Sequence, residues 1–413
     1  MLKRIHVDQL HLGMHLKEFC GSWMDHPFWR TGFVIKDPKD IDLILASNIR
    51  EVWIDCSKGS DVPPGEPVVS EEELPPAPIK PVDAPKRVKS RQETAPRPTS
   101  QEIERAARIC QLSRSAVVSM FEEVRMGKAV DVNSVREVVE DISDSIARNP
   151  TAIVSLARLK TADDYTYMHS VAVCALMVAL SGKLGLDEVQ TRSSGIAGLL
   201  HDLGKVAMPT EVLNKPGKLT VAEFDIMKTH PTEGYKMLMA SHGVDPVALD
   251  VVLHHHEKMD GSGYPEQLKG DQISLYARMG AVCDVYDAIT SNRPYKSGWD
   301  PAEAMHQMAQ WTNGHFDPKV FQAFIRGMGI YPVGSLVRLA SGRIGVVTEQ
   351  SAKSLAKPII KVFFSTKANM RIAPEMLDLS QSGIHERIQS REDPAHWNFP
   401  DLHQMWSGLS QVR

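Results

Sequence analysis

The sequence predicts a mainly α-helical protein with a small α+β domain at its N-terminus and a small β appendage at its C-terminus. Three observations predict this arrangement. Apolar residues recur at helical spacing over residues 101–330, alternate at strand spacing near both ends of the chain, and give way to a proline-rich stretch at residues 59–100. The length of 413 residues fits several domains of the usual ~100 to 200 residues.

The composition is that of a globular protein, with 42% hydrophobic residues, 24% charged residues and a formal net charge of -4. This balance lacks the positive excess that binding to duplex nucleic acid needs, so no such partner is expected. The 5 cysteines are scattered without CxxC spacing, which argues against a disulfide framework or a zinc ribbon. The N-terminus reaches Asp8 before any apolar run of signal-peptide length, and no run of ~18 apolar residues occurs. We therefore expect a cytoplasmic protein with no membrane segment.

The N-terminal third of the chain is expected to form three different structures. Residues 1–58 mix alternating stretches with one helical run, which is typical of a small α+β domain. Residues 59–100 are rich in Pro, Glu, Ser, Lys and Val, so we expect a partly extended linker. Two helical runs follow in residues 101–150, the second opened by Asp131 or Asn133 as an N-cap. Either a dimer interface or a layer packed on the main domain fits these connecting helices.

The main domain is expected at residues 151–330, where the helical pattern is strongest. A β appendage follows at residues 331–380. Three segments carry its strand pattern: residues 335–339, 344–348 and 358–364. Residues 381–413 are expected to be a tail laid over the domain surface.

Histidines and aspartates interrupt the helical pattern of the main domain at positions where apolar residues are expected. His169 lies in an apolar helix and, taken alone, would more often be a hydrogen-bonded core histidine. His201 and Asp202 end another apolar helix and are followed closely by Lys205. An imidazole beside a carboxylate at a helix end is a more specific signal for a metal site.

Further candidates follow along the chain. His230 stands at a helix end, three consecutive histidines occupy residues 254–256, and Asp284 lies among residues that should be buried. A buried carboxylate needs a cation or several hydrogen-bond donors. Nitrogen and oxygen ligands without cysteine favour iron, manganese or zinc. Two such metals ~3.5 to 4 Å apart can clamp a phosphate, so phosphoester hydrolysis is the favoured reaction.

These residues lie in motifs that resemble the signature of the HD-GYP family, the HD phosphohydrolases that degrade the bacterial messenger cyclic di-GMP. The signature is carried by His201-Asp202 and by His255-His256-Glu257-Lys258-Met259-Asp260-Gly261-Ser262-Gly263-Tyr264-Pro265. Supporting matches are His169, residues 213–220, His230-Pro231, Ala277-Arg278, residues 284–288 and residues 293–296. The resemblance covers roughly residues 151–330 and implies a helical HD-type bundle that carries a dinuclear metal site. Residues 1–58 resemble a small domain of uncertain function that precedes some members.

The resemblance implies two divalent metal ions, iron or manganese, and a bridging hydroxide that attacks phosphorus. One ion would be held by His169, His201, Asp202 and Asp284. The other would be held by His230, His255 and His256, with Asp202 bridging. Some members hold a third metal through a glutamate four residues before the first histidine. Tyr165 stands at that position, so we expect two metals and not three.

The resemblance also implies how the substrate would be bound. Lys205 would lie beside the scissile phosphate and stabilise charge or assist the leaving oxygen. Arg293 and Lys296 would bind the phosphates, and Arg278 is a further candidate contact.

The glycine-rich loop would form the wall of the substrate site. Gly261 and Gly263 would let the backbone turn beside the substrate, and Tyr264 and Pro265 would fix the turn. Glu257 and Asp260 would orient ligands or the loop. Asp287 is a candidate hydrogen-bond partner of a ligand histidine, and His254 is expected to be structural.

The implied activity is hydrolysis of cyclic di-GMP to linear pGpG, with further conversion to GMP left open, in bacterial second-messenger signalling. One alternative is a receptor that binds cyclic di-GMP without hydrolysis and signals through partner proteins. Another is an HD nucleotidase that acts on a different phosphoester, against which the Gly-Tyr-Pro loop argues. The sequence leaves open a homodimer and protein signalling partners.

Overall fold

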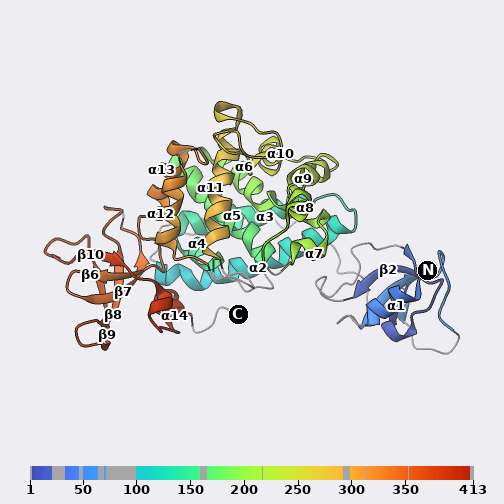
Figure 1. Cartoon of the computed structure of the whole chain (residues 1–413), viewed down its shortest axis with the longest axis horizontal. Helices are drawn as coiled ribbons and strands as arrows, with labels where there is room; N and C mark the ends of the chain where they lie inside the picture. The colour runs from blue at the N-terminus through green and yellow to red at the C-terminus, as the bar shows by residue number, and fades with distance from the viewer. Residues whose placement is uncertain are drawn as a thin grey trace, which may run out of the picture. The chain divides into compact units, whose positions relative to one another are not determined.

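The computed structural model describes residues 2–20, 33–45, 50–63, 69–70, 99–158, 165–215, 217–291, 298–312, 314–351 and 353–409. The chain divides into two compact units, Met1–Val88 and Lys89–Arg413. The larger unit is mainly helical and carries a sheet near the C-terminus, as the sequence predicts (Figure 1).

The N-terminal unit is a small α+β domain, also as predicted. Its five-stranded antiparallel sheet has the order β3-β2-β4-β1-β5. The elements are β1 (Leu2–His6), β2 (His15–Cys20), β3 (Phe33–Val34), α1 (Pro38–Leu45), β4 (Glu51–Asp55) and β5 (Val69–Ser70). Its core is formed by apolar side chains from these elements, such as Ile5, Leu16, Ile44 and Ile54.

Strand β5 lies inside the segment that the sequence predicts as a linker. Val69 pairs with Arg4, and Ser70 pairs with Lys3, so the sheet includes residues beyond the predicted domain end at residue 58. Prolines and glutamates surround this two-residue strand in the sequence and conceal its pattern.

The helical bundle of the larger unit is built around α5 (Tyr165–Leu184). Its other long helices are α2 (Thr99–Arg125), α3 (Val132–Arg148), α6 (Glu188–Leu200), α11 (Leu275–Thr290), α12 (Pro301–Trp311) and α13 (Pro318–Met328). Helix α5 packs against α2, α3, α6, α11, α13 and the short α4 (Ala152–Ala157). Residues Thr166–Leu184 are long and apolar enough for a membrane span, but 83% of the most apolar window is buried by the bundle. Packing in the core therefore accounts for the apolar character of α5.

Helices α2 and α3 pack on the bundle, which is one of the two arrangements that the sequence left open. Asp131 caps α3 by accepting a hydrogen bond from the Asn133 backbone amide at 3.0 Å. A buried ion pair joins the two helices, with Arg148 Nη2 2.8 Å from Glu102 Oε1. Ser145 also donates a hydrogen bond to Glu102, so polar contacts fix how α2 lies against α3 inside an apolar core.

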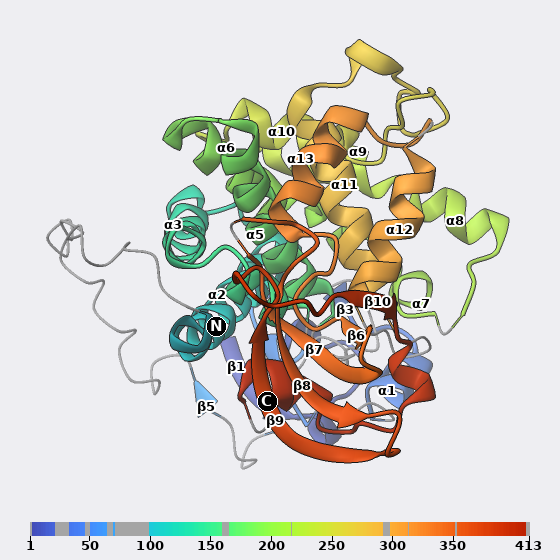
Figure 2. The same cartoon turned by 90° about the vertical axis from the view of Figure 1, so that its left-hand side faces the viewer.

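The C-terminal part of the larger unit is a five-stranded antiparallel sheet in the order β10-β6-β7-β8-β9 (Figure 2). Its strands are β6 (Leu336–Leu339), β7 (Arg343–Glu349), β8 (Ile359–Ser365), β9 (Met370–Asp378) and β10 (Ile388–Arg391). The first three confirm the predicted strands. The prediction of a surface tail after residue 380 is wrong for β10, since Arg391 pairs with Val337. Helix α14 (Leu402–Ser407) then packs on β7 and buries Trp406.

Candidate metal centre

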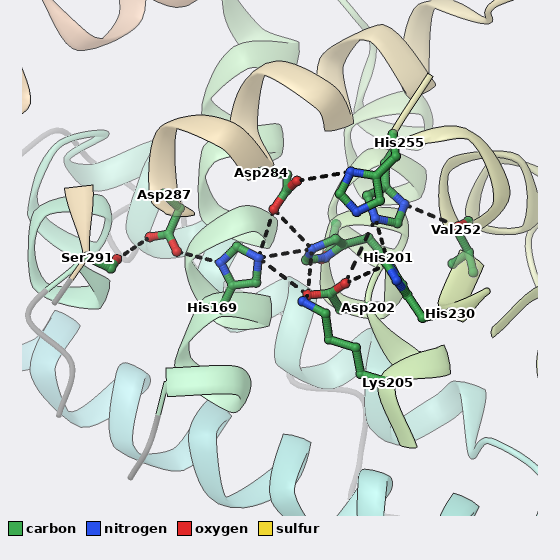
Figure 3. Close-up of polar contacts among 12 residues, drawn as sticks. His169, His201, Asp202, Lys205, His230, Val252, His255, Asp284, Asp287 and Ser291 are labelled. Atoms are coloured by element: carbon green, nitrogen blue, oxygen red, sulfur yellow. Dashed lines mark hydrogen bonds and ion pairs between the residues drawn. The ribbon is translucent and has the colours of Figure 1, made fainter. Parts of the chain in front are cut away.

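Five separate places in the bundle supply the side chains of the candidate metal centre (Figure 3). His169 comes from α5, and His201 and Asp202 follow the last residue of α6. The others are His230 at the start of α9 (His230–Met239), His255 and His256 directly after α10 (Pro246–His254), and Asp284 in α11. The sequence-predicted ligands are thus all brought together.

Two glycines allow the backbone segments that carry Asp202 and His230 to approach each other. Gly204 lies in the 3₁₀ helix η4 (Leu203–Ala207), which follows Asp202 directly. A Cβ atom at Gly204 would lie 1.8 Å from the His230 carbonyl oxygen and 2.5 Å from the Gly234 amide nitrogen. No larger residue fits between η4 and α9, so Gly204 sets the distance between the two ligand-bearing segments.

The carboxylate-rich group consists of His169, His201 and Asp202, with Asp284 beside them. The ligand atoms of the first three lie within 4.8 Å of one another, and all three residues are buried. His169 Nε2 lies 3.0 Å from Asp284 Oδ1 and 3.4 Å from Asp202 Oδ2. His201 Nε2 lies 3.3 Å from the same Asp202 oxygen. Two imidazole nitrogens and two carboxylates therefore converge on one point.

The imidazole-rich group consists of His230, His255 and His256, whose ligand atoms also lie within 4.8 Å of one another. His230 Nε2 lies 3.3 Å from Asp202 Oδ1, and His255 Nε2 lies 3.9 Å from that oxygen. Asp202 thus directs one carboxylate oxygen to each group. This is the arrangement required of a carboxylate that bridges two cations.

The outer nitrogens of the buried histidines fix which ring nitrogen faces inward. His201 Nδ1 bonds the Gly198 carbonyl oxygen at 2.9 Å, and His230 Nδ1 bonds the Met227 carbonyl oxygen at 2.8 Å. A carbonyl oxygen only accepts, so each Nδ1 carries a proton and each Nε2 is the nitrogen that faces the centre and can bind a metal. The same holds for His255, whose Nδ1 lies 3.0 Å from the Val251 carbonyl oxygen.

The outer nitrogen of His169 differs, because it meets a carboxylate. Its Nδ1 lies 2.6 Å from Asp287 Oδ2, as the sequence analysis suggested for Asp287. Ser291 donates a hydrogen bond at 3.4 Å to the other oxygen of Asp287. A carboxylate behind a histidine makes the inward nitrogen a stronger metal ligand.

The donor set fits divalent metal ions. His169 Nε2 and His201 Nε2 lie 3.2 Å apart, and His230 Nε2 and His255 Nε2 lie 3.4 Å apart. With the proton of each ring on Nδ1, the Nε2 atoms of each pair face each other with their lone pairs. Asp202 Oδ1 is a buried oxygen with no hydrogen-bond partner among the described residues. Lone pairs that face each other beside an unpaired carboxylate oxygen are stabilised by a cation.

The pKa shifts differ between the carboxylate-rich group and the imidazole-rich group. Burial by itself would raise the pKa of Asp202, but Lys205 and the neighbouring imidazoles lower that pKa well below its usual range. Burial would likewise lower the pKa of His169, but its hydrogen bonds to Asp284 and Asp287 outweigh burial and raise it. In the imidazole-rich group, burial lowers the pKa of His256 to about 3 and that of His255 well below its usual range. His255 and His256 are therefore neutral ligands at neutral pH.

Lys205 is the cation that lies closest to the shared carboxylate among the described residues. Its Nζ is 2.5 Å from Asp202 Oδ2, and its side chain is partly exposed at 21%. The lysine therefore faces both the carboxylate-rich group and solvent, where a phosphate would approach.

The glycine-rich loop packs against the imidazole-rich group. Tyr264 stacks on His256 with ring centroids 4.7 Å apart and is joined to Pro265 by a cis peptide bond. Glu257 is buried and accepts backbone hydrogen bonds from Glu266 at 2.7 Å and Leu268 at 3.1 Å. A Cβ atom at Gly263 would lie 2.5 Å from the Glu257 Cα atom, so the loop closes tightly on itself.

The remaining site predictions have mixed outcomes. Arg278 contacts protein groups, since it pairs with Asp317 at 2.8 Å and donates to the Ile273 carbonyl oxygen at 2.9 Å. Its proposed contact with substrate stays a prediction. Arg293 and Lys296, and the side chain of Tyr165, lie outside the described residues. His254 points to Asp250 and Glu266, at 2.8 and 3.3 Å, which agrees with a structural role.

Gly204 was expected only to end the helix before it, and the roles of Gly234 and Ser291 were not predicted from the sequence. A glycine two residues after the His-Asp pair, and another four residues after His230, were the available signals for close backbone packing. Ser291 offered no such signal, because its role depends on the end of α11 lying beside His169.

Fold and site together define an HD-domain protein with two groups of side chains that could hold metal. Residues 140–320 match the HD domain family, and residues 2–135 match a family described as a domain of unknown function, DUF3391. Cyclic di-GMP phosphodiesterase PA4108 of Pseudomonas aeruginosa is 52% identical over 412 residues, which cover 100% of this chain and 97% of that protein. The chain belongs to the HD-GYP family of cyclic di-GMP phosphodiesterases.

More distant relatives match less than half of the chain. The cyclic di-GMP phosphodiesterase response regulator RpfG of Xanthomonas campestris is 40% identical over 198 residues, 46% of this chain and 52% of that protein. The 3'3'-cGAMP-specific phosphodiesterase 1 of Vibrio cholerae is 36% identical over 168 residues, 40% of this chain and 39% of that protein. The similarity therefore extends to relatives named for different cyclic dinucleotides.

Proposed function

We propose that this protein is a metal-dependent phosphodiesterase that hydrolyses cyclic di-GMP. The observation that carries the proposal is Asp202, which directs Oδ2 to the carboxylate-rich group and Oδ1 to the imidazole-rich group, with Lys205 2.5 Å from Oδ2. The match to a cyclic di-GMP phosphodiesterase over the whole chain supports the same substrate.

The two groups would hold two divalent ions, iron or manganese. His169, His201, Asp202 and Asp284 are the proposed ligands of one ion, and His230, His255 and His256 those of the other, with Asp202 shared. Bound ions supply Lewis acidity toward the phosphate and lower the pKa of water. The described residues supply about the number of ligands that two ions need.

The protein's own residues would orient the diester and manage its charge. Hydrolysis adds water to phosphorus, breaks one phosphorus–oxygen ester bond and delivers a proton to the leaving sugar oxygen. The Lys205 ammonium would stabilise the negative charge that develops on the phosphoryl oxygens and donate to the leaving oxygen. Burial and the nearby carboxylates raise the pKa of Tyr264, so its phenol stays protonated. The phenol can therefore donate a hydrogen bond to an acceptor such as a phosphate oxygen.

Opening of one ester bond yields linear pGpG, which we propose as the first product. Arg293 and Lys296 are proposed to bind its phosphates, and Gly261, Gly263, Tyr264 and Pro265 to form the wall of the site. We further propose a cytoplasmic location, in keeping with the burial of α5 in the bundle.

The test is a product assay on the full chain, purified without oxygen and loaded with Fe(II) or Mn(II). Cyclic di-GMP, 3'3'-cGAMP and bis(p-nitrophenyl) phosphate are offered separately, and products are resolved by chromatography. We expect pGpG from cyclic di-GMP, with loss of activity in His201→Ala and Asp202→Ala. His254→Gln, whose side chain points away from the centre, is the matched control and should retain activity.

Two outcomes would overturn the proposal. Binding of cyclic di-GMP in equilibrium dialysis without product formation would favour a receptor. Higher kcat/KM for 3'3'-cGAMP than for cyclic di-GMP would assign a different substrate.

A further inference from the structure

Helix α8 (Val221–Met227) is an apolar surface beside the metal centre. It buries none of its seven side chains. Val221, Phe224 and Ile226 are exposed at 80%, 46% and 40%. Isolated exposed apolar residues are common, but three on so short a helix mark a surface that meets a ligand or partner.

Polar contacts, not burial, hold this helix in place. Thr220 caps it by accepting a hydrogen bond from the Glu223 amide, and the Glu223 carboxylate accepts one from the Thr220 amide at 2.7 Å. Lys215 Nζ lies 2.6 Å from the same carboxylate. The helix therefore presents its apolar side chains at a fixed position without packing them into a core.

Phe224 faces the metal centre through Tyr264. The two rings meet edge to face, with centroids 6.4 Å apart and an interplanar angle of 83°. Tyr264 in turn stacks on His256, a proposed metal ligand. A contiguous row of rings thus runs from the imidazole-rich group to an aromatic side chain that is nearly half exposed.

A cation accompanies the exposed ring. Lys228 Nζ lies over the Phe224 ring, 5.3 Å from its centroid, and is paired with Asp225 Oδ1 at 2.7 Å, which leaves further N–H donors of the ammonium for a base edge. Guanine presents two acceptors, O6 and N7, on one edge of a flat π surface, and lysine is one of the side chains that bind this pair. Adenine has a donor in place of O6. An aromatic ring with an ammonium near its face therefore suits a guanine better than an adenine.

We propose that Phe224 stacks on one guanine base of the substrate and that Lys228 binds the O6 and N7 edge of that base. The proposal rests on the proposed function and names the residues that select the base. Phe224 holds the base while the phosphate lies at the metal centre, so the pair determines specificity and takes no part in bond breaking.

The test compares kinetics of Phe224→Leu, Phe224→Trp and the wild type in the metal-loaded full chain. Phe224→Leu keeps apolar bulk but removes the π face, so KM for cyclic di-GMP should rise about 5- to 100-fold. Phe224→Trp should stay near the wild-type value. Hydrolysis of bis(p-nitrophenyl) phosphate, which has no purine, should be unchanged in both and confirms that the centre is intact. Val221→Ala, one turn away on the same helix, is the matched control.

A second arm tests Lys228. Lys228→Met should reduce the preference for cyclic di-GMP over cyclic di-AMP, measured as the ratio of kcat/KM values. An unchanged KM for cyclic di-GMP in Phe224→Leu would overturn the inference while leaving the proposed function intact. An equal rise in KM for cyclic di-GMP and cyclic di-AMP in Lys228→Met would do the same. A wild type that does not cleave cyclic di-GMP would overturn the proposed function itself, and the inference with it.

Discussion

The two halves of the metal centre share Asp202 but differ in charge and in access. The carboxylate-rich group is buried, and its imidazole at residue 169 is held from behind by Asp287. In the imidazole-rich group, backbone carbonyls hold the rings of His230 and His255, and the His256 side chain is 24% exposed beside Tyr264. Negative charge is thus concentrated in the carboxylate-rich group, and the imidazole-rich group is the more accessible to solvent.

This difference teaches how one carboxylate can serve two unequal positions. The position with Asp202, Asp284 and nearby Asp287 is suited to hold an ion firmly and to stabilise a higher charge. The position with three imidazoles is suited to exchange its ion and to meet the substrate. We expect the carboxylate-rich group to fill first when metal is added.

Replacement of Asp202 should have the largest effect, because it removes the one residue common to both groups. In Asp202→Ala we expect less than one metal ion per chain and no measurable hydrolysis of cyclic di-GMP. Elemental analysis and the product assay measure the two effects. Retention of both ions would show that the groups are independent.

Replacement of Lys205 should come next and should separate catalysis from metal binding. Lys205→Met removes the ammonium beside Asp202 Oδ2, so kcat should fall about 10²- to 10³-fold. Metal content should match the wild type, because a lysine ammonium has no lone pair for a metal. Loss of an ion in this variant would show instead that Lys205 is needed to hold the carboxylate-rich group in its metal-binding arrangement.

Replacement of Asp287 should distinguish the two groups directly. Asp287→Asn keeps the shape but removes the charge behind His169, so affinity at the carboxylate-rich group should fall about 10- to 100-fold. Competition with a chelator during stepwise metal addition gives the affinity of each position. Ser291→Ala leaves the Asp287 charge in place and is the control. Equal weakening at both positions would contradict the division.

The smallest expected effect is on stability and concerns His254, the one histidine of the three-residue run that belongs to neither group. Burial lowers its pKa, but contacts with Asp250 and Glu266 outweigh burial and raise the pKa above 6.5. A raised folded-state pKa stabilises the fold fully below the unfolded value, and this stabilisation is lost as pH rises through the folded value. His254→Gln should therefore lower the free energy of unfolding by about 1 kcal/mol near pH 6. Urea unfolding at that pH and again near pH 9 should show the difference shrinking.

Much of the centre was predictable because histidine and aspartate are conspicuous within apolar helices. His169, Asp202 and Asp284 stood out in this way, and the structure places them together. The sequence suggested Asp287 as a partner of a ligand histidine but not which ring it contacts, and it did not predict which rings have a carbonyl behind them. That partner is set by how helices pack, as when α11 brings Asp287 to His169.

The fold shows the same limit at its edges. Strands with clear alternation, such as β7 and β8, were predicted, whereas β2, β5, β9 and β10 were not. Of these, β5 and β10 are short edge strands whose place is set by pairing with a distant partner, Arg4 or Val337. Phe224 was hidden for a related reason, since an exposed aromatic side chain is indistinguishable in sequence from a buried one.

The buried pair of Glu102 and Arg148 bears on how this protein can be divided. Glu102 belongs to the segment that matches the domain of unknown function, and Arg148 to the segment that matches the HD domain. A cut between the two segments would separate the pair and expose a charge to an apolar core. The boundary between the two sequence families therefore lies inside the larger compact unit, Lys89–Arg413, in which the ion pair joins α2 and α3.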